Sequence, residues 1–197
     1  MIKLLTVRKE RVDNMKESSK LKVLDMTYIA VSAVIIAVCS WISIPAPIPF
    51  TMQTFAICLV VGTLGGKRGT IAVLIYLLLG ALGVPVFAGF TGGLGVLGGV
   101  TGGYLVGFIL SALLMWGMEK WLGKKTYILG ISMVLGLLVC YAFGTAWFMF
   151  VYGKNTGPIG LGAALMSCVV PYLIPDCIKI AIALPLSKKL AKILKLN

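Results

Sequence analysis

The stretch TYILGISMVLGLLVCYAFGTAWFMFVY, residues 126 to 152, contains no charged residue. It is longer than the roughly 20 apolar residues that a helix needs to cross a bilayer. The rest of the chain has the same character, because 59% of its 197 residues are hydrophobic and only 12% are charged. In a soluble domain about a quarter of the residues are charged. The sequence therefore predicts an all-α integral membrane protein.

Other apolar runs, interrupted by Gly, Pro and Lys, predict the remaining helices of a six-helix domain. They cover roughly 26–44, 52–65, 69–84, 103–119 and 160–187. The second and third runs are short for a complete span, so we expect tilt or irregular buried backbone near their outer ends. We expect one membrane domain, residues 25–197. A basic segment, residues 1–24, precedes it and lacks the apolar stretch of a secretory signal.

The positions of the basic residues predict the orientation of the helices. Lys and Arg cluster before the first helix, between the second and third, between the fourth and fifth, and after the sixth. Since cytoplasmic segments are enriched in Lys and Arg, we expect these segments and both termini in the cytoplasm. The outer side then has three loops, residues 44–53, 84–104 and 152–160. We attribute the net charge of +12 to contact with anionic lipid head groups and not with nucleic acid.

Composition also limits the chemistry of the chain. The sequence contains no histidine, which removes the commonest general base and the commonest metal ligand. Its five cysteines form no C-x-x-C pair and lie in apolar runs, so neither a disulfide nor a metal site is indicated. We therefore expect no catalytic residue, no bound metal and no cofactor.

The loop VPVFAGFTGGLGVLGGVTGGY, residues 84 to 104, is rich in glycine. Residues 93–98 match the G-x-G-x-x-G pattern of dinucleotide-binding folds, but no strand is predicted before them and no acidic residue follows at the spacing that holds a ribose. Composition alone is compatible with a flexible loop. However, Phe87, Phe90 and Tyr104 make the segment too apolar for a solvated linker. We expect a compact lid that packs onto the bundle, close to a ligand.

Asp176 and Lys179 are charged residues that the predicted topology places inside a span. Counting from Lys188 at about 1.5 Å per residue, Asp176 lies roughly 18 Å from the cytoplasmic boundary. Because the two residues are three positions apart, their side chains project from one face of the helix. Charges at that depth need a partner or a polar cavity. The pair is either a mutually neutralising contact that fixes helix packing or part of a binding site.

The first predicted helix carries a stripe of small residues, Ala30, Ala33 and Ala37. The small-xxx-small spacing of Ala33 and Ala37 lets another helix approach closely. This stripe suits packing inside the chain and docking of a partner equally well. Aromatic residues near the ends of the predicted spans are interpreted as anchors at the membrane interface, and they are Tyr28, Trp41, Trp116, Trp121 and Tyr127.

Four segments together resemble one known family in their order and separation. They are PIPFTMQ at 47–53, GALGVPVFAG at 80–89, TGGYLVGF at 101–108 and PDCIK at 175–179. The combination is similar to the BioY family, the biotin-specific substrate-binding (S) components of energy-coupling-factor (ECF) transporters in prokaryotic cell membranes. The resemblance extends from about residue 25 to about residue 190. It implies a six-helix S-component fold that holds biotin near the outer surface, under the first and third outer loops.

The resemblance also implies roles for individual residues. Asp176 would accept hydrogen bonds from the ureido ring of biotin, and Lys179 would help to bind the valerate carboxylate. The fused rings of biotin would lie against the glycine-rich loop. The residues that this likeness assigns to biotin binding are Asp176, Lys179, Tyr104, Phe90, Thr91, Phe87 and Gln53.

The energy source is expected on other subunits. GGKRGT, residues 65–70, has a lysine after glycine but lacks the G-x-x-x-x-G-K-[ST] pattern that cradles phosphates, so another subunit must hydrolyse ATP. The resemblance implies two ATPase subunits and a transmembrane coupling subunit. It further suggests that the coupling subunit docks on Ala30, Ala33 and Ala37.

Two other classes of function are alternatives to a binding subunit. A self-sufficient ion-coupled carrier would use Asp176 to take up a proton or a sodium ion. An intramembrane enzyme would use Asp176 as an acid or a base, but a lone carboxylate beside Lys179 lacks the paired catalytic group that hydrolysis normally needs. We therefore expect a binding subunit and not an enzyme.

Overall fold

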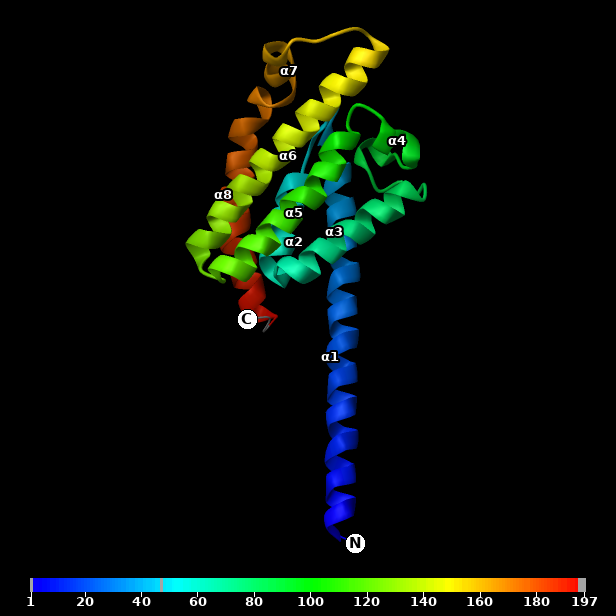
Figure 1. Cartoon of the computed structure of the whole chain (residues 1–197), viewed down its shortest axis with the longest axis vertical. Coiled ribbons are helices and arrows are strands. Elements are labelled where there is room, and N and C mark those ends of the chain that lie inside the picture. The colour runs from blue at the N-terminus through cyan, green and yellow to red at the C-terminus, as the bar shows by residue number, and fades with distance from the viewer. Residues whose placement is uncertain (1, 47, 195–197) are drawn as a thin grey trace.

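The structure is a computed structural model that describes residues 2–46 and 48–194, with side chains from Lys22 onward. It is mostly helical (Figure 1). The longer helices are α1 (Ile2–Trp41), α2 (Gln53–Leu64), α3 (Gly66–Ala81), α5 (Gly102–Leu122), α6 (Thr126–Asn155) and α8 (Val170–Ile193). The shorter elements are strands β1 (Ser43–Ile44) and β2 (Phe50–Thr51), the 3₁₀ turn η1 (Ala88–Phe90), and helices α4 (Leu94–Gly98) and α7 (Leu161–Cys168).

The apolar runs are helical over most of their length, but Ser43 and Ile44, expected at the end of the first helix, form strand β1. Two further differences from the predicted boundaries are larger. The first is that α1 begins at Ile2, so the basic N-terminal segment and the first apolar run form one helix that extends beyond the bundle (Figure 1). The second is that the last predicted helix is divided into α7 and α8 at Val169, whose dihedral angles are not helical (φ −125°, ψ −56°). Pro171 explains this break, because it lacks an N–H group and suits the first turn of a new helix.

The lengths of the helices agree with the short second and third apolar runs. In the part of the chain that the structure describes, four helical segments are long and apolar enough to cross a membrane: Lys22–Trp41, Gly102–Leu122, Thr126–Asn155 and Val170–Ile193. α2 and α3 have 12 and 16 residues, which is less than a full span. Irregular backbone adjoins both, since the β1–β2 hairpin precedes α2 and the glycine-rich loop follows α3.

Close helix contacts build the bundle. α5 packs along α6, and α2 packs along α8. Small residues at these contacts let the backbones approach. A Cβ atom at Gly107 of α5 would lie 3.0 Å from the sulfur of Cys140 on α6, and a Cβ atom at Gly136 of α6 would overlap the hydroxyl of Ser111 on α5. These two glycines therefore fix the register of α5 against α6.

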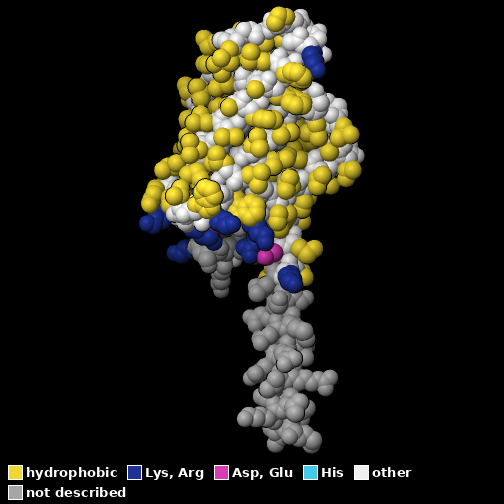
Figure 2. Space-filling view, in the orientation of Figure 1, with side chains coloured by type: hydrophobic (Ala, Val, Ile, Leu, Met, Phe, Trp, Pro, Cys, Tyr) yellow, Lys and Arg dark blue, Asp and Glu magenta, His cyan; other side chains and the backbone are white. Residues whose placement is uncertain are grey.

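The outside of the bundle is hydrophobic. Figure 2 shows hydrophobic side chains over the side of the bundle, while Lys and Arg side chains gather at the end where α1 leaves it. Val34, Leu78, Leu138 and Ile178 are examples of large apolar side chains that are exposed. An apolar surface of this extent would promote aggregation in water but suits the hydrocarbon of a bilayer. The chain is a multi-pass membrane protein.

The glycine-rich loop, residues 84–104, has the compact fold predicted for it. It contains η1 and α4, and two of its glycines, Gly89 and Gly93, have positive φ angles that other residues rarely adopt. Two indole groups anchor it to the bundle. Trp41 Nε1 of α1 donates a hydrogen bond of 2.9 Å to the Pro85 carbonyl, and Trp147 Nε1 of α6 donates one of 3.0 Å to the Gly99 carbonyl.

Candidate functional site

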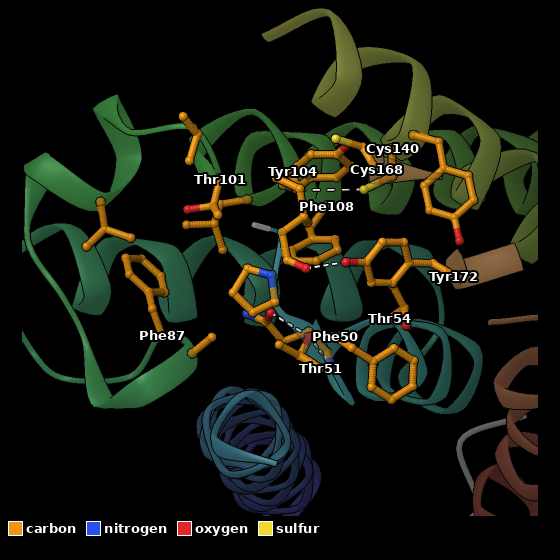
Figure 3. A pocket seen from close by; sticks show the side chains of 18 of the residues that line it. Phe50, Thr51, Thr54, Phe87, Thr101, Tyr104, Phe108, Cys140, Cys168 and Tyr172 are labelled. Atoms are coloured by element: carbon orange, nitrogen blue, oxygen red, sulfur yellow. Dashed lines mark hydrogen bonds between the residues drawn. The ribbon is translucent and has the colours of Figure 1, made fainter. Parts of the chain in front are cut away.

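A cavity of about 390 Å³ lies between the β1–β2 hairpin, the glycine-rich loop and helices α2, α5, α6 and α8 (Figure 3). This volume is within the range of roughly 300–1,000 Å³ that is common for small-molecule sites. Much of the wall is apolar or aromatic, with Phe87 from the glycine-rich loop, Phe108 from α5 and Tyr172 from α8. Polar groups are concentrated where α2 meets α8.

Asp176 and Lys179 form an ion pair in the wall of this cavity. The distance from Lys179 Nζ to Asp176 Oδ1 is 2.8 Å, and the residues expose only 3% (Asp176) and 6% (Lys179) of their surface. They are one turn apart on α8, as their spacing predicted. The pair therefore neutralises itself and also faces a cavity, so the two interpretations drawn from the sequence are compatible.

The carboxylate of Asp176 joins three helices. Thr54 Oγ1 of α2 donates a hydrogen bond of 2.8 Å to Oδ1, and the Tyr141 hydroxyl of α6 donates one of 2.5 Å to Oδ2. Each carboxylate oxygen can accept two hydrogen bonds. Oδ1 already has two donors, Lys179 and Thr54, while Oδ2 has one. Oδ2 therefore keeps the capacity to accept a hydrogen bond from a ligand.

The ammonium group of Lys179 ties α8 to the β1–β2 hairpin. Its Nζ atom donates a hydrogen bond of 2.7 Å to the carbonyl oxygen of Thr51 and lies 3.9 Å from the centre of the Phe50 ring. A second tie comes from Tyr172, whose hydroxyl donates a hydrogen bond to the Ile48 carbonyl. These contacts place the β1–β2 hairpin directly over the charged part of the cavity wall.

Gln53 lines the cavity, but the groups of its side-chain amide already have partners. Nε2 donates a hydrogen bond of 2.6 Å to the Tyr76 hydroxyl, and Oε1 accepts one of 2.8 Å from the Thr51 hydroxyl. Tyr76 is fully buried and packs edge-on against Phe87 at 5.6 Å between ring centres. In this structure Gln53 therefore positions the hairpin and the wall of the cavity.

Tyr104 and Phe87 form much of the apolar wall. The Tyr104 hydroxyl lies 3.0 Å from the hydroxyl of Thr145 on α6, which fixes the ring position. Gly144 leaves the room for that ring, because a Cβ atom there would overlap it. Thr91 also lines the cavity, and its hydroxyl donates a hydrogen bond of 2.9 Å to the Ala88 carbonyl.

The BioY family model matches residues 14–196 of this chain. The chain belongs to the BioY family. The match confirms the resemblance carried by the four sequence segments. It also begins earlier than those segments indicated, inside the basic N-terminal segment, which the resemblance had left out.

Other BioY proteins are similar to this chain over most of their length. The biotin transporter BioY of Thermotoga maritima is 41% identical over 160 residues, which cover 81% of this chain and 90% of that protein. The probable biotin transporter BioY of Pyrococcus horikoshii is 34% identical over 171 residues, covering 86% and 98%. A crystal structure of the S-component for biotin from an ECF-type ABC transporter superposes with a TM-score of 0.79 at 29% identity, covering 88% of this chain and 93% of that one.

The fold of this BioY chain brings together most of the residues assigned to the site from sequence. Asp176, Lys179, Tyr104, Thr91, Phe87 and Gln53 all line the cavity. Phe90 requires a correction. It is 64% exposed and stacks on Trp41 at 5.0 Å between ring centres, outside the cavity lining. Phe90 follows the positive-φ residue Gly89 in η1 and itself has a φ of 56°, and this turn directs its side chain towards α1.

The alanine stripe requires a second correction. Ala33 and Ala37 are 2% and 6% exposed and belong to the core of the bundle, so neither is available to dock a partner. Their spacing serves packing inside the chain, where α1 contacts α2 and α3. Ala30 is exposed on the same helix.

Several residues of the BioY cavity were not singled out from the sequence. Tyr141 and Thr54 bind the Asp176 carboxylate, and Phe50 covers the Lys179 ammonium. A signal existed for Tyr141, because a tyrosine in the middle of a long apolar run must find a partner for its hydroxyl. No local signal distinguishes Thr54, since the threonine becomes part of the site only when α2 packs against α8.

Proposed function

We propose that this chain is the high-affinity biotin-binding S component of an ECF uptake transporter. The observation that carries this proposal is the buried Asp176–Lys179 pair in the wall of an apolar cavity, in a chain of the BioY family. The named relatives are biotin transporters, and the structural relative is an S-component for biotin. The chain binds and delivers the vitamin, and it catalyses no covalent reaction.

Biotin suits the chemistry of the cavity. Its ureido ring presents N–H donors and a carbonyl acceptor side by side, its fused rings are apolar, and its carboxylate lies at the far end of a flexible chain. Asp176 Oδ2 accepts a ureido N–H, and Tyr104, Phe87 and Phe108 enclose the fused rings. Burial of these rings supplies most of the binding free energy, while the polar contacts supply specificity.

The close spacing of the ion pair favours one of two roles for Lys179. Its ammonium lies 2.8 Å from the carboxylate of Asp176, so a ligand group beside Asp176 is also beside Lys179. The ureido carbonyl meets that condition, whereas the valerate carboxylate would have to fold back over the rings. We therefore assign Lys179 to the ureido carbonyl, in place of the carboxylate that family resemblance suggested.

The proposed membrane topology has six spans with both termini in the cytoplasm. It counts α1, α2, α3, α5, α6 and the α7–α8 segment as the spans and rests on the positive-inside rule. Its support is the gathering of Lys and Arg side chains at one end of the bundle (Figure 2), while Lys154 lies in the last turn of α6. The cavity then opens near the outer surface. Residues 1–24 form a cytoplasmic segment, and residues 25–197 form the membrane domain.

The proposal requires partner subunits. A transmembrane coupling subunit and two ATPase subunits supply the energy, in line with the ECF-type ABC transporter to which the structural relative belongs. Since Ala33 and Ala37 are buried, the coupling subunit has to contact other surfaces, with Ala30 and its exposed neighbours Val34 and Val38 as candidates on α1.

The environment of Asp176 does not favour an ion-coupled carrier. Three donors, on Lys179, Thr54 and Tyr141, point hydrogen atoms at the carboxylate. Such an arrangement suits an acceptor for N–H groups, whereas a sodium site needs several oxygen ligands turned towards the ion.

Isothermal titration of the purified chain in detergent tests the proposal. We expect tight binding of biotin, weaker binding of desthiobiotin, which lacks the sulfur-containing ring, and no binding of riboflavin or thiamine. Binding of riboflavin or thiamine in preference to biotin would contradict the assignment. Uptake of biotin by cells that lack coupling subunits, abolished by an ionophore, would favour a self-sufficient carrier.

A further inference from the structure

A second, smaller cavity of about 50 Å³ lies at the opposite end of α2 and α8 from the biotin cavity. Its wall combines the end of α2, the end of α5, the α5–α6 turn, the start of α6 and the end of α8. The polar side chains in this wall are Thr63, Glu119, Lys124, Ser132 and Lys188. A water molecule needs about 10–15 Å³ of such volume, so the cavity has room for a few waters or one phosphate group and not for a vitamin.

The charges around this cavity are unequal. The carboxylate of Glu119 already accepts a hydrogen bond from the Gly66 N–H at the start of α3, and it lies 3.7 Å from Lys124 Nζ. Lys188 Nζ donates a hydrogen bond of 2.8 Å to the Lys124 carbonyl and contacts no carboxylate among the described residues. The two lysines and one glutamate leave a net positive charge, which suits an anion with a single negative charge.

Thr63 supplies an independent sign of a missing partner. Thr63 is 7% exposed and forms part of the cavity wall. Its hydroxyl has no hydrogen-bond partner among the residues that the structure describes. Buried hydroxyls are nearly always hydrogen-bonded, because an unpaired one loses its contact with water without compensation. A polar ligand in this cavity would supply the missing contact.

The position of the cavity points to a lipid. Trp121 and Tyr127 are exposed on either side of the turn that carries Lys124. Exposed aromatic side chains of this kind mark the level of the lipid head groups. Basic pockets between helices on the cytoplasmic side of membrane proteins are typical sites for anionic phospholipid head groups. Lysine binds phosphate as a compact charge with several donors.

We propose that this cavity binds the phosphate group of an anionic phospholipid such as phosphatidylglycerol. Lys124 and Lys188 donate to the phosphate oxygens, and the Thr63 hydroxyl completes the contacts. The site clamps the α5–α6 turn to α8 and α2, so its occupation stabilises the cytoplasmic end of the bundle. This inference goes beyond the proposed function and does not depend on biotin being the vitamin.

Thermal unfolding of the purified full-length chain in detergent tests this site. Because a ligand that binds the folded state raises the midpoint, phosphatidylglycerol should raise it by several degrees, and phosphatidylcholine should not. Lys188→Gln and Thr63→Val should each lose about half of that rise or more, because each removes a direct contact with the phosphate group. Lys192→Gln is the matched control, because Lys192 is exposed on the same helix and outside the cavity wall.

Three outcomes would overturn the proposal. An equal rise for phosphatidylglycerol in the wild type and in both cavity variants would mean diffuse attraction to the basic end of the bundle. An equal rise for phosphatidylcholine would mean that the head-group charge is not recognised. An equal rise with millimolar inorganic phosphate alone would assign the cavity to free phosphate and not to a lipid. Elution of each variant as a single symmetric peak in gel filtration separates these results from misfolding.

Discussion

Tyr141 of α6 donates a hydrogen bond of 2.5 Å to Asp176 of α8, and both residues line the larger cavity. This bond couples the binding site to the packing of the bundle. Thr54 of α2 binds the other oxygen of the same carboxylate, so one acidic side chain connects three helices that are far apart in sequence. Changes at Asp176 should therefore affect both ligand affinity and stability, and the two effects have to be measured separately.

We predict that Asp176→Asn weakens biotin binding at least about tenfold, or by about 1.4 kcal/mol. The amide keeps the shape of the carboxylate but removes its charge and leaves Lys179 buried without a counter-ion. Isothermal titration measures the affinity, and thermal unfolding measures any loss of stability. Asp25→Asn is the control, because Asp25 pairs with Arg68 away from the cavity. Unchanged affinity in Asp176→Asn would remove the carboxylate from the site.

Tyr141→Phe should weaken biotin binding by about 0.5–1.5 kcal/mol, the usual net worth of one hydrogen bond. The substitution removes only the hydroxyl that fixes the orientation of Asp176, and the ring still fills its place. Titration calorimetry checks this prediction. Tyr127→Phe serves as the control because Tyr127 is exposed far from the cavity. Equal affinities for the two variants would show that Tyr141 does not position the carboxylate.

The helices could be predicted from sequence because apolar runs of span length have few alternatives in a membrane protein. The division of the last helix at Val169 was not predicted, since the apolar run continues across the break and hides it. The extension of α1 to Ile2 was not predicted either, because polar residues carry no signal of span length.

The site was predictable in part. Asp176 and Lys179 could be found because charged residues are rare inside a predicted membrane span and need a partner or a polar cavity there. Their partners could not, since Thr54 and Tyr141 are 122 and 35 residues from Asp176 and meet it only through helix packing. The same limit explains the alanine stripe, because small-xxx-small spacing favours close contact without identifying the partner helix.

Ala33→Trp should damage the fold itself. Ala33 is 2% exposed in the core of the bundle, and overpacking of a close helix contact costs about 1–3 kcal/mol or more. We predict low expression and a lower unfolding midpoint in detergent, where no coupling subunit is present. Ala30→Trp, on the exposed face of the same helix, should unfold like the wild type. A stable Ala33→Trp protein with normal biotin affinity would restore the docking interpretation of this stripe.

Gly144→Ala should narrow the larger cavity at the part of its wall that Tyr104 forms. A Cβ atom at this position overlaps the ring of Tyr104, so the ring has to move towards the cavity or α6 has to move away from α5. We expect a loss of biotin affinity of about tenfold or more, measured by titration. Gly117→Ala on α5 is the matched control, since nothing lies within 4 Å of its added methyl group. That control should be neutral or slightly stabilising, because alanine favours helices by about 0.5–1 kcal/mol over glycine.

Lys179→Ala distinguishes the two roles considered for this lysine. If the ammonium binds the ureido carbonyl, the substitution weakens biotin and the neutral analogue biotinamide by the same factor, because both carry the same ureido ring. We expect losses of about tenfold or more for each, since a buried polar contact of about 1–3 kcal/mol is removed. A loss confined to biotin would assign Lys179 to the carboxylate and would require the valerate chain to fold back over the ion pair. Lys154→Ala is the control. The ammonium of Lys154 lies 4.2 Å from the centre of the Phe150 ring, outside the cavity wall, so this substitution should leave both affinities unchanged.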